Sequence, residues 1–221
     1  LERFCCIMQD TETNYETDLF MPIIRKCETL ASYKYENEYK NKNYKLIAGV
    51  DEVGRGPLAG PVVTACVIMD LDNLIEGVDD SKKLSEKKRE KLFDEIISHA
   101  ISYKISQVDE KTIDEINILE ATKKCMENSI NEMSVTPDVV FVDAVKLEGV
   151  GVEQVSIIKR DAKSYNIACA SILAKVTRDR FMVELDETYP KYNFKKHKGY
   201  GTREHIEAIK QFGPCAIHRR S

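Results

Sequence analysis

The chain has 221 residues, of which 43% are hydrophobic and 32% are charged, values typical of a globular protein with one substantial core. Its longest apolar runs, such as residues 61–69, fall well short of the roughly 18 residues that a membrane span requires. This composition excludes a chain too polar to fold, and it predicts a protein without membrane association.

The net charge is −4, but the charges are unevenly distributed. Residues 156–221 carry 14 Lys and Arg against 7 Asp and Glu, a net charge of +7, which leaves −11 for the rest of the chain. A basic C-terminal third favours a face that binds a polyanion such as nucleic acid.

The seven cysteines are scattered through the chain without CxxC spacing. An odd number with this spacing argues against a disulfide framework and against a thiolate zinc site. We therefore expect reduced thiols in a cytoplasmic protein. The cysteines do not indicate the oligomeric state, for which we expect a monomer.

In chain order, residues 1–43 are polar and poorly periodic, and they predict one or two short helices and a linker beside a catalytic domain at 44–221. Apolar runs rich in Val and Ile follow at 45–53 and 61–69. A segment rich in Gly and Pro joins them, which predicts a hairpin-like strand pair with a long loop. Ser85 then predicts a helix cap, and residues 101–108 predict an edge strand.

The second half of the chain alternates between strand and helix patterns. Residues 109–133 predict a long amphipathic helix, residues 137–142 a buried strand and residues 154–159 a further strand. Helices are expected at 164–187 and 202–212, the last closed by a Gly-Pro pair. Successive strands followed by alternating strands and helices predict an α/β fold, with helices covering a mixed sheet.

Acidic side chains stand at the ends of three of these strands. Asp51 and Glu52 lie near the end of the first strand. Asp143 ends the strand Val-Val-Phe-Val, and Asp161 follows the strand at 154–159. A carboxylate in such a position costs roughly several kcal/mol unless its charge is compensated. Because open sheets gather function at strand ends, these acids are candidates for one common site.

Four converging carboxylates repel one another, and a divalent cation removes that conflict. Oxygen ligands of this kind suit Mg²⁺ or Mn²⁺, and one or two such ions would activate water for attack on a phosphate. Neighbouring strand residues point to opposite faces, so we expect the strand to end or bulge between Asp51 and Glu52. The alternative is that each acid pairs with a nearby Lys or Arg.

Several segments of the chain resemble type 2 ribonuclease H (ribonuclease HII). The most specific is AGVDEVGRGPLAGPV at residues 48–62. Supporting segments are DSKKL at 80–84, VD at 142–143, DAKS at 161–164, ASILAKVTRD at 170–179, KGYGT at 198–202 and GPCAIHR at 213–219. The resemblance runs in order from about residue 45 to the C-terminus.

This resemblance implies the ribonuclease H fold, a five-stranded mixed sheet flanked by helices with a C-terminal helical region. It further implies hydrolysis of the RNA strand of RNA–DNA hybrids and cleavage 5′ to single ribonucleotides in duplex DNA, which suggests a role in repair. The four acids it assigns to metal binding and catalysis are Asp51, Glu52, Asp143 and Asp161.

The resemblance also implies a site that recognises the junction where a ribonucleotide is followed by DNA. Gly54, Arg55 and Gly56 would bring backbone N–H groups close to the 2′-hydroxyl, which distinguishes RNA from DNA. Tyr200 would pack its ring against the following deoxyribose, and Lys82 would contact phosphate. Arg160 departs from the family's usual Gly immediately before Asp161, which would either strain the backbone or turn a cation toward phosphate.

Two other functions remain open from the residues alone. A metal-dependent phosphatase acting on small phosphate esters would need neither a basic face nor an aromatic platform. A nucleic-acid-binding protein without catalysis would bind hybrids tightly and leave them intact in Mg²⁺ or Mn²⁺.

Overall fold

The computed structural model describes residues 33–143, 145–157 and 164–221. Within these ranges one sheet has the strand order β3-β2-β1-β4-β5. The strands are β1 (Ile47–Val53), β2 (Val62–Met69), β3 (Ala100–Val108), β4 (Val139–Val142) and β5 (Glu153–Ser156). Because β1 pairs antiparallel with β2 and parallel with β4, the sheet is mixed, as the sequence predicted.

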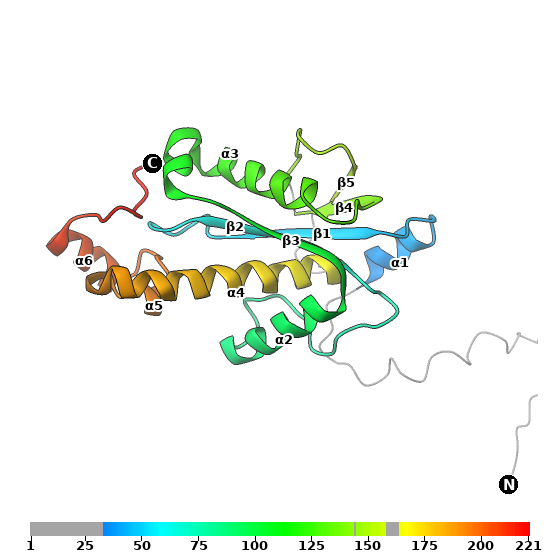
Figure 1. The fold of residues 1–221 in the computed structure, drawn as a ribbon, viewed down its shortest axis with the longest axis horizontal. Helices are drawn as coiled ribbons and strands as arrows, with labels where there is room; N and C mark the ends of the chain where they lie inside the picture. Colours follow the sequence, from blue (N-terminus) through cyan, green and yellow to red (C-terminus); the bar gives the residue numbers. More distant parts are fainter. Residues whose placement is uncertain (1–32, 144, 158–163) are drawn as a thin grey trace, which may run out of the picture.

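Helices cover both faces of this sheet. The helices are α1 (Lys34–Lys40), α2 (Glu86–His99), α3 (Glu110–Asn131), α4 (Tyr165–Thr188), the 3₁₀-helix η2 (Pro190–Tyr192), α5 (Phe194–His197) and α6 (Arg203–Phe212). Figure 1 shows α4 along one face of the sheet, α3 along the other and α2 outside α4. No helix in the described ranges is both long and apolar enough to cross a membrane.

The long helices begin at side chains that accept a hydrogen bond from the first turn. Ser85 caps α2, Asp109 caps α3 and Ser164 caps α4, each by accepting from the backbone N–H three residues later. Thr202 caps α6 in the same way. Such caps satisfy N–H groups that have no partner inside the helix, which is why these residue types mark helix starts.

Gly49 allows α4 to lie directly on β1. A Cβ atom at this position would come within 2.3 Å of the backbone nitrogen of Ile167. Asn166 uses the close approach to bridge two strands: its Nδ2 donates to the Ile47 carbonyl, and its Oδ1 accepts from the Met69 N–H. The N-terminus of α4 is therefore fixed against the centre of the sheet.

Helix α1 joins the N-terminal segment to the same region. The ring of Tyr39 packs edge-on against Phe141 of β4, with the ring centroids 5.1 Å apart. The fully buried Glu36 accepts a hydrogen bond from the Asn166 N–H at the start of α4. Residues 33–43, which the sequence assigned to an extension, thus pack on the sheet and on α4.

The structure differs from the sequence-based elements at β5 and within α3, and it adds the short helices η2 and α5. Strand β5 ends at Ser156, earlier than expected, and lies at the edge of the sheet with no fully buried residue. Helix α3 is interrupted at Asn117, whose φ is 69°. The Asn117 side chain accepts from the N–H groups of Leu119 and Glu120, so it caps a second helical segment inside the predicted helix.

Candidate active site

The acids of β1 and β4 meet at the same end of the sheet. Val50 pairs with Val142 in the parallel ladder between these strands. Asp51 and Asp143 are the next residue on each strand, so they follow at the same level along the sheet. Asp51 is nearly buried, with 9% of its surface exposed, whereas Asp143 is exposed just beyond the end of β4.

Strand β1 continues through the acidic pair, which corrects the expectation of a strand end or bulge between Asp51 and Glu52. Asp51 pairs with Ala65, Glu52 with Thr64 and Val53 with Val63, in a register without interruption. The two carboxylates therefore leave opposite faces of β1. The charges of Asp51 and Asp143 nevertheless both act on Glu52, so the three acids are close enough to interact just beyond the end of β4.

Glu52 lies in an electrostatically unfavourable position. Burial, together with the neighbouring charges of Asp51 and Asp143, raises its pKa from 4.5 to about 7, against a lowering effect of Arg55. Arg55 Nη1 lies 3.5 Å from Glu52 Oε1. Repulsion among carboxylates in a partly buried site is the condition that a divalent cation relieves.

The fourth acid, Asp161, and its neighbour Arg160 lie outside the described residues. In the part of the chain that the structure describes, no three His, Cys, Asp or Glu side chains form a cluster that could already hold a metal ion. Asp161 precedes the α4 cap Ser164 by three residues in the sequence, and α4 begins against β1.

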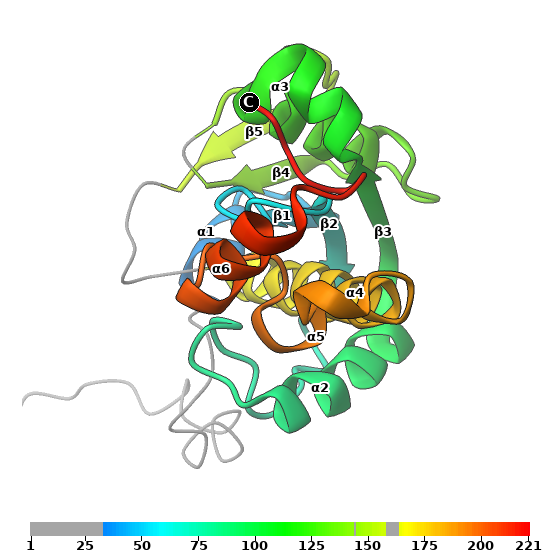
Figure 2. The ribbon, with the colours of Figure 1, turned by 90° about the vertical axis from the view of Figure 1, so that its left-hand side faces the viewer.

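The loop at residues 54–56 and Tyr200 lie side by side, although they are far apart in the sequence. A Cβ atom at Gly56 would lie 3.9 Å from the Tyr200 ring. The Leu58 N–H donates to the Gly199 carbonyl at 2.8 Å, which joins the two segments. The Tyr200 ring is 40% exposed and stands next to the loop. Figure 2 shows α6 and the C-terminal segment in front of the ends of β1 and β2.

Two arginines that sequence reasoning did not single out hold this loop. Arg178, fully buried in α4, donates to the carbonyls of Pro61, Ala59 and Lys198 at 2.9–3.0 Å. Its Nε would lie 2.5 Å from a Cβ atom at Gly54, where φ is +98°, so that position accepts only glycine. Burial lowers the Arg178 pKa.

Arg219 completes the clamp from the C-terminal segment. Its guanidinium donates to the carbonyls of Gly54, Arg55, Pro57 and Gly60 at 2.6–3.2 Å. Burial, together with the nearby Arg178, lowers its pKa to about 10. One feature of the sequence could have indicated the role of Arg178. It lies four residues after Ala174, on a helix face of small buried residues. An arginine there must satisfy its donors internally.

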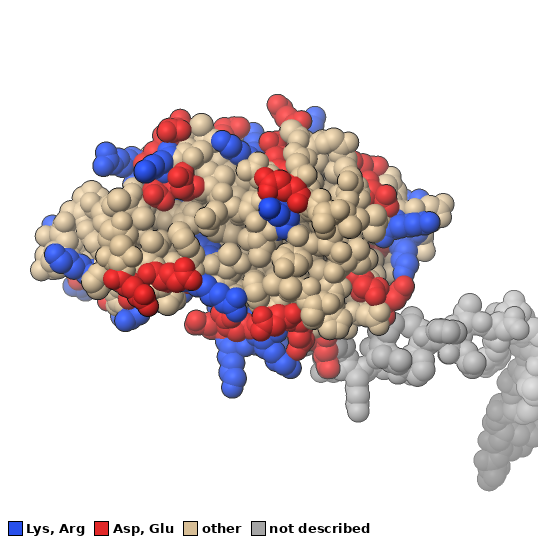
Figure 3. Space-filling model, in the orientation of Figure 1, with Lys and Arg blue, Asp and Glu red and all other residues tan. Residues whose placement is uncertain are grey.

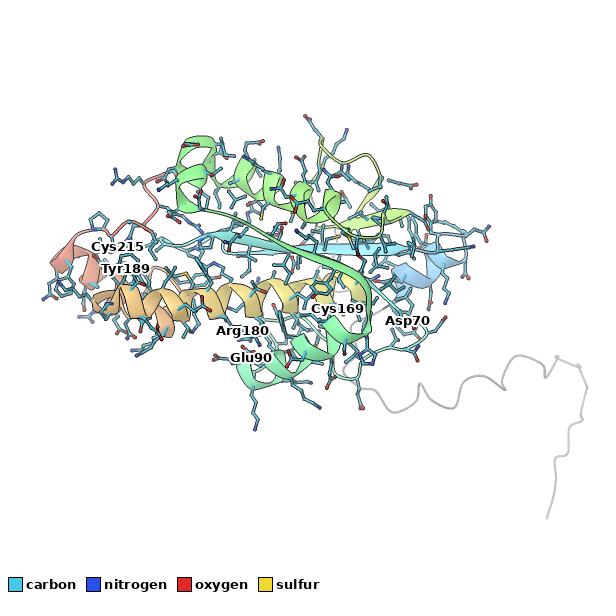
Figure 4. The ribbon with its side chains drawn as sticks, in the orientation of Figure 1. Asp70, Glu90, Cys169, Arg180, Tyr189 and Cys215 are labelled. Atoms are coloured by element: carbon cyan, nitrogen blue, oxygen red, sulfur yellow. The ribbon has the colours of Figure 1, made fainter. Side chains whose placement is uncertain are left out.

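The remaining cationic residues are less concentrated than the charge count suggested. On the face shown in Figure 3, Lys and Arg alternate with Asp and Glu. Several C-terminal cations have acidic partners: the pairs are Lys175–Asp179, Arg180–Glu90, Lys195–Asp186, Lys196–Glu204 and Arg203–Glu207. Figure 4 shows Glu90 and Arg180 reaching toward each other between α2 and α4.

Lys82 is exposed on the turn before α2, and this turn is anchored to α4. The Ser81 hydroxyl lies 2.8 Å from that of Ser171 in α4, and Arg89 donates to the Ser81 carbonyl. The backbone N–H of Lys82 donates to Asp80. Among the described contacts, none joins Lys82 to the acids or to the loop at 54–56.

Comparison with known proteins identifies the same family that the motifs resemble. The family model described as Ribonuclease HII matches residues 48–221. A ribonuclease HII from Caldicellulosiruptor bescii is 57% identical over 198 residues, which cover 90% of this chain and 96% of that protein.

Solved structures agree with this match. The ribonuclease H2 from Pyrococcus horikoshii OT3 is 33% identical with a TM-score of 0.67, over 80% of this chain and 93% of that chain. The RNase HII in the PCNA:RNase HII complex from Archaeoglobus fulgidus is 30% identical with a TM-score of 0.69, over 80% of this chain and 94% of that one.

Proposed function

Because the chain belongs to the ribonuclease HII family of endoribonucleases, we propose that it hydrolyses the RNA strand of RNA–DNA hybrids and cuts duplex DNA on the 5′ side of single embedded ribonucleotides. The products are 3′-hydroxyl and 5′-phosphate ends. The observation that carries this proposal is the shared level of Asp51 and Asp143, beside a Glu52 whose pKa is raised.

The family uses a divalent metal, and we assign Asp51, Glu52, Asp143 and Asp161 to hold one or two ions of Mg²⁺ or Mn²⁺. An all-carboxylate donor set suits these hard cations. The bound metal supplies an activated water and neutralises charge at the phosphate. The raised pKa of Glu52 supports this assignment, because a cation removes the repulsion that the carboxylates exert on one another.

We include Asp161 in this set because it lies close in the chain to the start of α4. Ser164 and Asn166 anchor the start of α4 against β1, and Asp161 lies three residues before Ser164. Glu36 adds a further tie from α1. A short connection from this anchor limits the distance between Asp161 and the acids of β1. We also propose that residues 1–43 form an extension to a catalytic domain at residues 44–221.

The loop at 54–56 is proposed to read the ribose through its backbone. Each peptide bond directs its C=O and its N–H to opposite sides, and the described chain has no cis peptide bond. Because the carbonyls of Gly54 and Arg55 point to Arg219, the N–H groups of Arg55 and Gly56 point away from it. Two such donors beside the Tyr200 ring suit the 2′-hydroxyl of a ribonucleotide.

The remaining contacts are with the sugar–phosphate backbone. In the absence of substrate the Arg55 side chain pairs with Glu52, and a cation at Glu52 would release it to contact phosphate. Lys82, exposed on its turn, is proposed to contact phosphate as well.

Cys66, Cys125 and Cys169 are buried free thiols, which supports a reducing, cytoplasmic location.

The test is cleavage of a DNA duplex that contains one ribonucleotide, by the wild type and by Asp143→Asn, in Mg²⁺ and in Mn²⁺. We expect a cut on the 5′ side of the ribonucleotide by the wild type only, with an all-DNA duplex left intact. Tight binding without cleavage would indicate the non-catalytic alternative. Hydrolysis of a simple phosphate ester but not of the duplex would indicate a phosphatase.

A further inference from the structure

Three buried histidines lie beneath Tyr200, outside the set of acids. His197 of α5, His205 of α6 and His218 of the C-terminal segment have between 0% and 7% of their surface exposed. Figure 4 shows this end of the molecule, where Cys215 and Tyr189 are labelled beside α6. The rings of His197 and His205 stack with centroids 4.4 Å apart.

The partners of His205 and His218 fix where each proton lies. A carbonyl only accepts, so His205 Nδ1, which lies 2.9 Å from the Tyr200 oxygen, carries a proton and donates. A backbone N–H only donates, so His218 Nδ1 accepts from Cys215 at 2.9 Å and carries none. The contact of 3.0 Å between the two Nε2 atoms then runs from His218 to His205.

The resulting chain of donors has one direction and leaves both rings neutral. It runs from the Cys215 N–H through His218 and His205 to the Tyr200 carbonyl. A second proton on His205 would face the Nε2–H of His218, and a second proton on His218 would face the Cys215 N–H. Either imidazolium therefore breaks a hydrogen bond of the chain.

The hydrogen-bond partners of His197 also fix which of its ring nitrogens carries the proton. Its Nε2 donates to the Tyr192 carbonyl at 2.7 Å, and its Nδ1 accepts from the Gly199 N–H at 3.2 Å. The carbonyl of His197 also accepts from the Tyr200 N–H at 2.9 Å. The Tyr200 N–H is thus held by His197, and the Tyr200 carbonyl accepts from His205 and from the Thr202 N–H at 2.8 Å.

His218 connects this arrangement to the loop that faces Tyr200. Its backbone pairs with Ala59 in an isolated antiparallel bridge. The next residue, Arg219, binds the carbonyls of the loop from Gly54 to Gly60. A shift of the His218 ring would therefore disturb both halves of the recognition site.

The surroundings favour uncharged rings. Burial lowers the pKa values of His205 and His218, and the other histidines lower them further. The titratable and charged groups near the three rings are Tyr192, Cys215, Glu204 and, acting on Cys215, Glu110. Glu204 is exposed and is paired with Lys196, so it offers little compensation for an imidazolium.

We propose that His205 and His218 are positioning residues for ribonucleotide recognition, which form a histidine relay (Cys215 N–H to His218 to His205 to the Tyr200 carbonyl) that works only when both rings are neutral. Acidification adds a proton at His205 Nε2 or His218 Nδ1, which breaks a hydrogen bond of the relay, displaces the His218 ring next to the Arg219 clamp and reduces the preference for a ribonucleotide. The proposal rests on the proposed function, because it takes Tyr200 as part of the recognition site.

The first experiment reads the protons directly in the wild-type protein. The chain has four histidines, so NMR of the ring nitrogens after histidine labelling gives four assignable sites. At about pH 7.5 we expect Nδ1–H on His205 and Nε2–H on His197 and His218, with exposed His99 as the reference. An imidazolium or a reversed tautomer at His205 or His218 would overturn the relay.

The second experiment measures the ratio of dissociation constants for an all-DNA duplex and for a duplex with one ribonucleotide, without divalent metal. In the wild type we expect this ratio to fall about tenfold from about pH 7.5 to about pH 4.5, because the lowered pKa values of His205 and His218 put protonation below the ordinary histidine value. His205→Asn keeps a donor near the Nδ1 position but lacks the Nε2 acceptor for His218, so its ratio should be low at both values. His205→Leu should give a low ratio at both.

The control is His99→Gln, which removes an exposed histidine and should behave as the wild type. An unchanged ratio in His205→Leu, or a wild-type ratio independent of pH, would overturn the relay. Should His205→Leu fail to fold, the tautomers of the wild type still decide the question. A wild type that prefers neither duplex at any pH would instead contradict the proposed recognition role of Tyr200.

Discussion

Asp51 and Asp143 lie at the same level of two neighbouring parallel strands, because Val50 pairs with Val142 immediately before them. This register brings together residues that are more than ninety positions apart in the sequence. Glu52 is the next residue of β1, and its pKa is raised by burial and by the charges of both aspartates. The predictions below concern this group of acids and the recognition site beside it.

The stability of the metal-free protein should depend on the protonation of Glu52. Its pKa is 4.5 when unfolded and about 7 when folded, so between these values the folded state keeps a proton that the unfolded state has lost. The free energy of unfolding should therefore fall with rising pH across this window, by roughly 3 kcal/mol at most.

Glu52→Gln should remove this dependence and stabilise the metal-free protein above pH 7, while it weakens cleavage. The check is thermal unfolding in a chelator across the pH range, with exposed Glu148→Gln as the control. A Glu52→Gln protein that melts lower than the wild type at high pH would contradict the raised pKa.

Arg219→Lys should loosen the loop at 54–56. A lysine ammonium cannot reach the four carbonyls that the planar guanidinium serves, and unpaired buried carbonyls cost roughly 2 to 4 kcal/mol in total. We expect a lower melting temperature and a raised KM for the duplex with one ribonucleotide, with kcat nearly unchanged.

The matched control for that substitution is Arg203→Lys, an exposed arginine paired with Glu207. Equal KM values for the wild type and Arg219→Lys would show that the clamp does not position the loop for recognition.

Tyr200→Ala should raise KM for the ribonucleotide-containing duplex about tenfold, since loss of an aromatic packing surface costs roughly 1 to 3 kcal/mol. Tyr200→Phe keeps the ring and should behave nearly as the wild type. Tyr103→Ala on edge strand β3 removes a similarly exposed tyrosine away from the loop and serves as the control. Comparable KM values for the two alanine variants would argue against a role for Tyr200.

The sequence predicted the helices and strands well where interactions between residues close in the chain decide the structure. Ser85, Asp109 and Thr202 marked helix starts, because a side-chain oxygen there satisfies the free N–H groups of the first turn. The buried strand ending at Asp143 was recognised from its apolar run, and its partner β1 likewise.

What the sequence did not predict depends on contacts between distant segments. The uninterrupted register at Asp51 and Glu52 follows from pairing with β2, which periodicity along one strand does not reveal. The roles of Arg178 and Arg219 depend on carbonyls more than 100 residues away in the sequence. Similarly, the charge count could not show that Arg178 is buried and Arg219 half-buried against this loop.

The most direct test of the shared cation site is a Mn²⁺ titration of the apoprotein, followed by the EPR signal of free Mn²⁺. We expect the wild type to bind one or two ions, and Asp143→Asn to bind at least about a hundredfold more weakly, because even outer partners of metal ligands cost 10 to 100-fold. Asp70→Asn, at a half-buried acid directly after β2, should leave the affinity unchanged. Equal Mn²⁺ affinities for the wild type and Asp143→Asn would contradict the account.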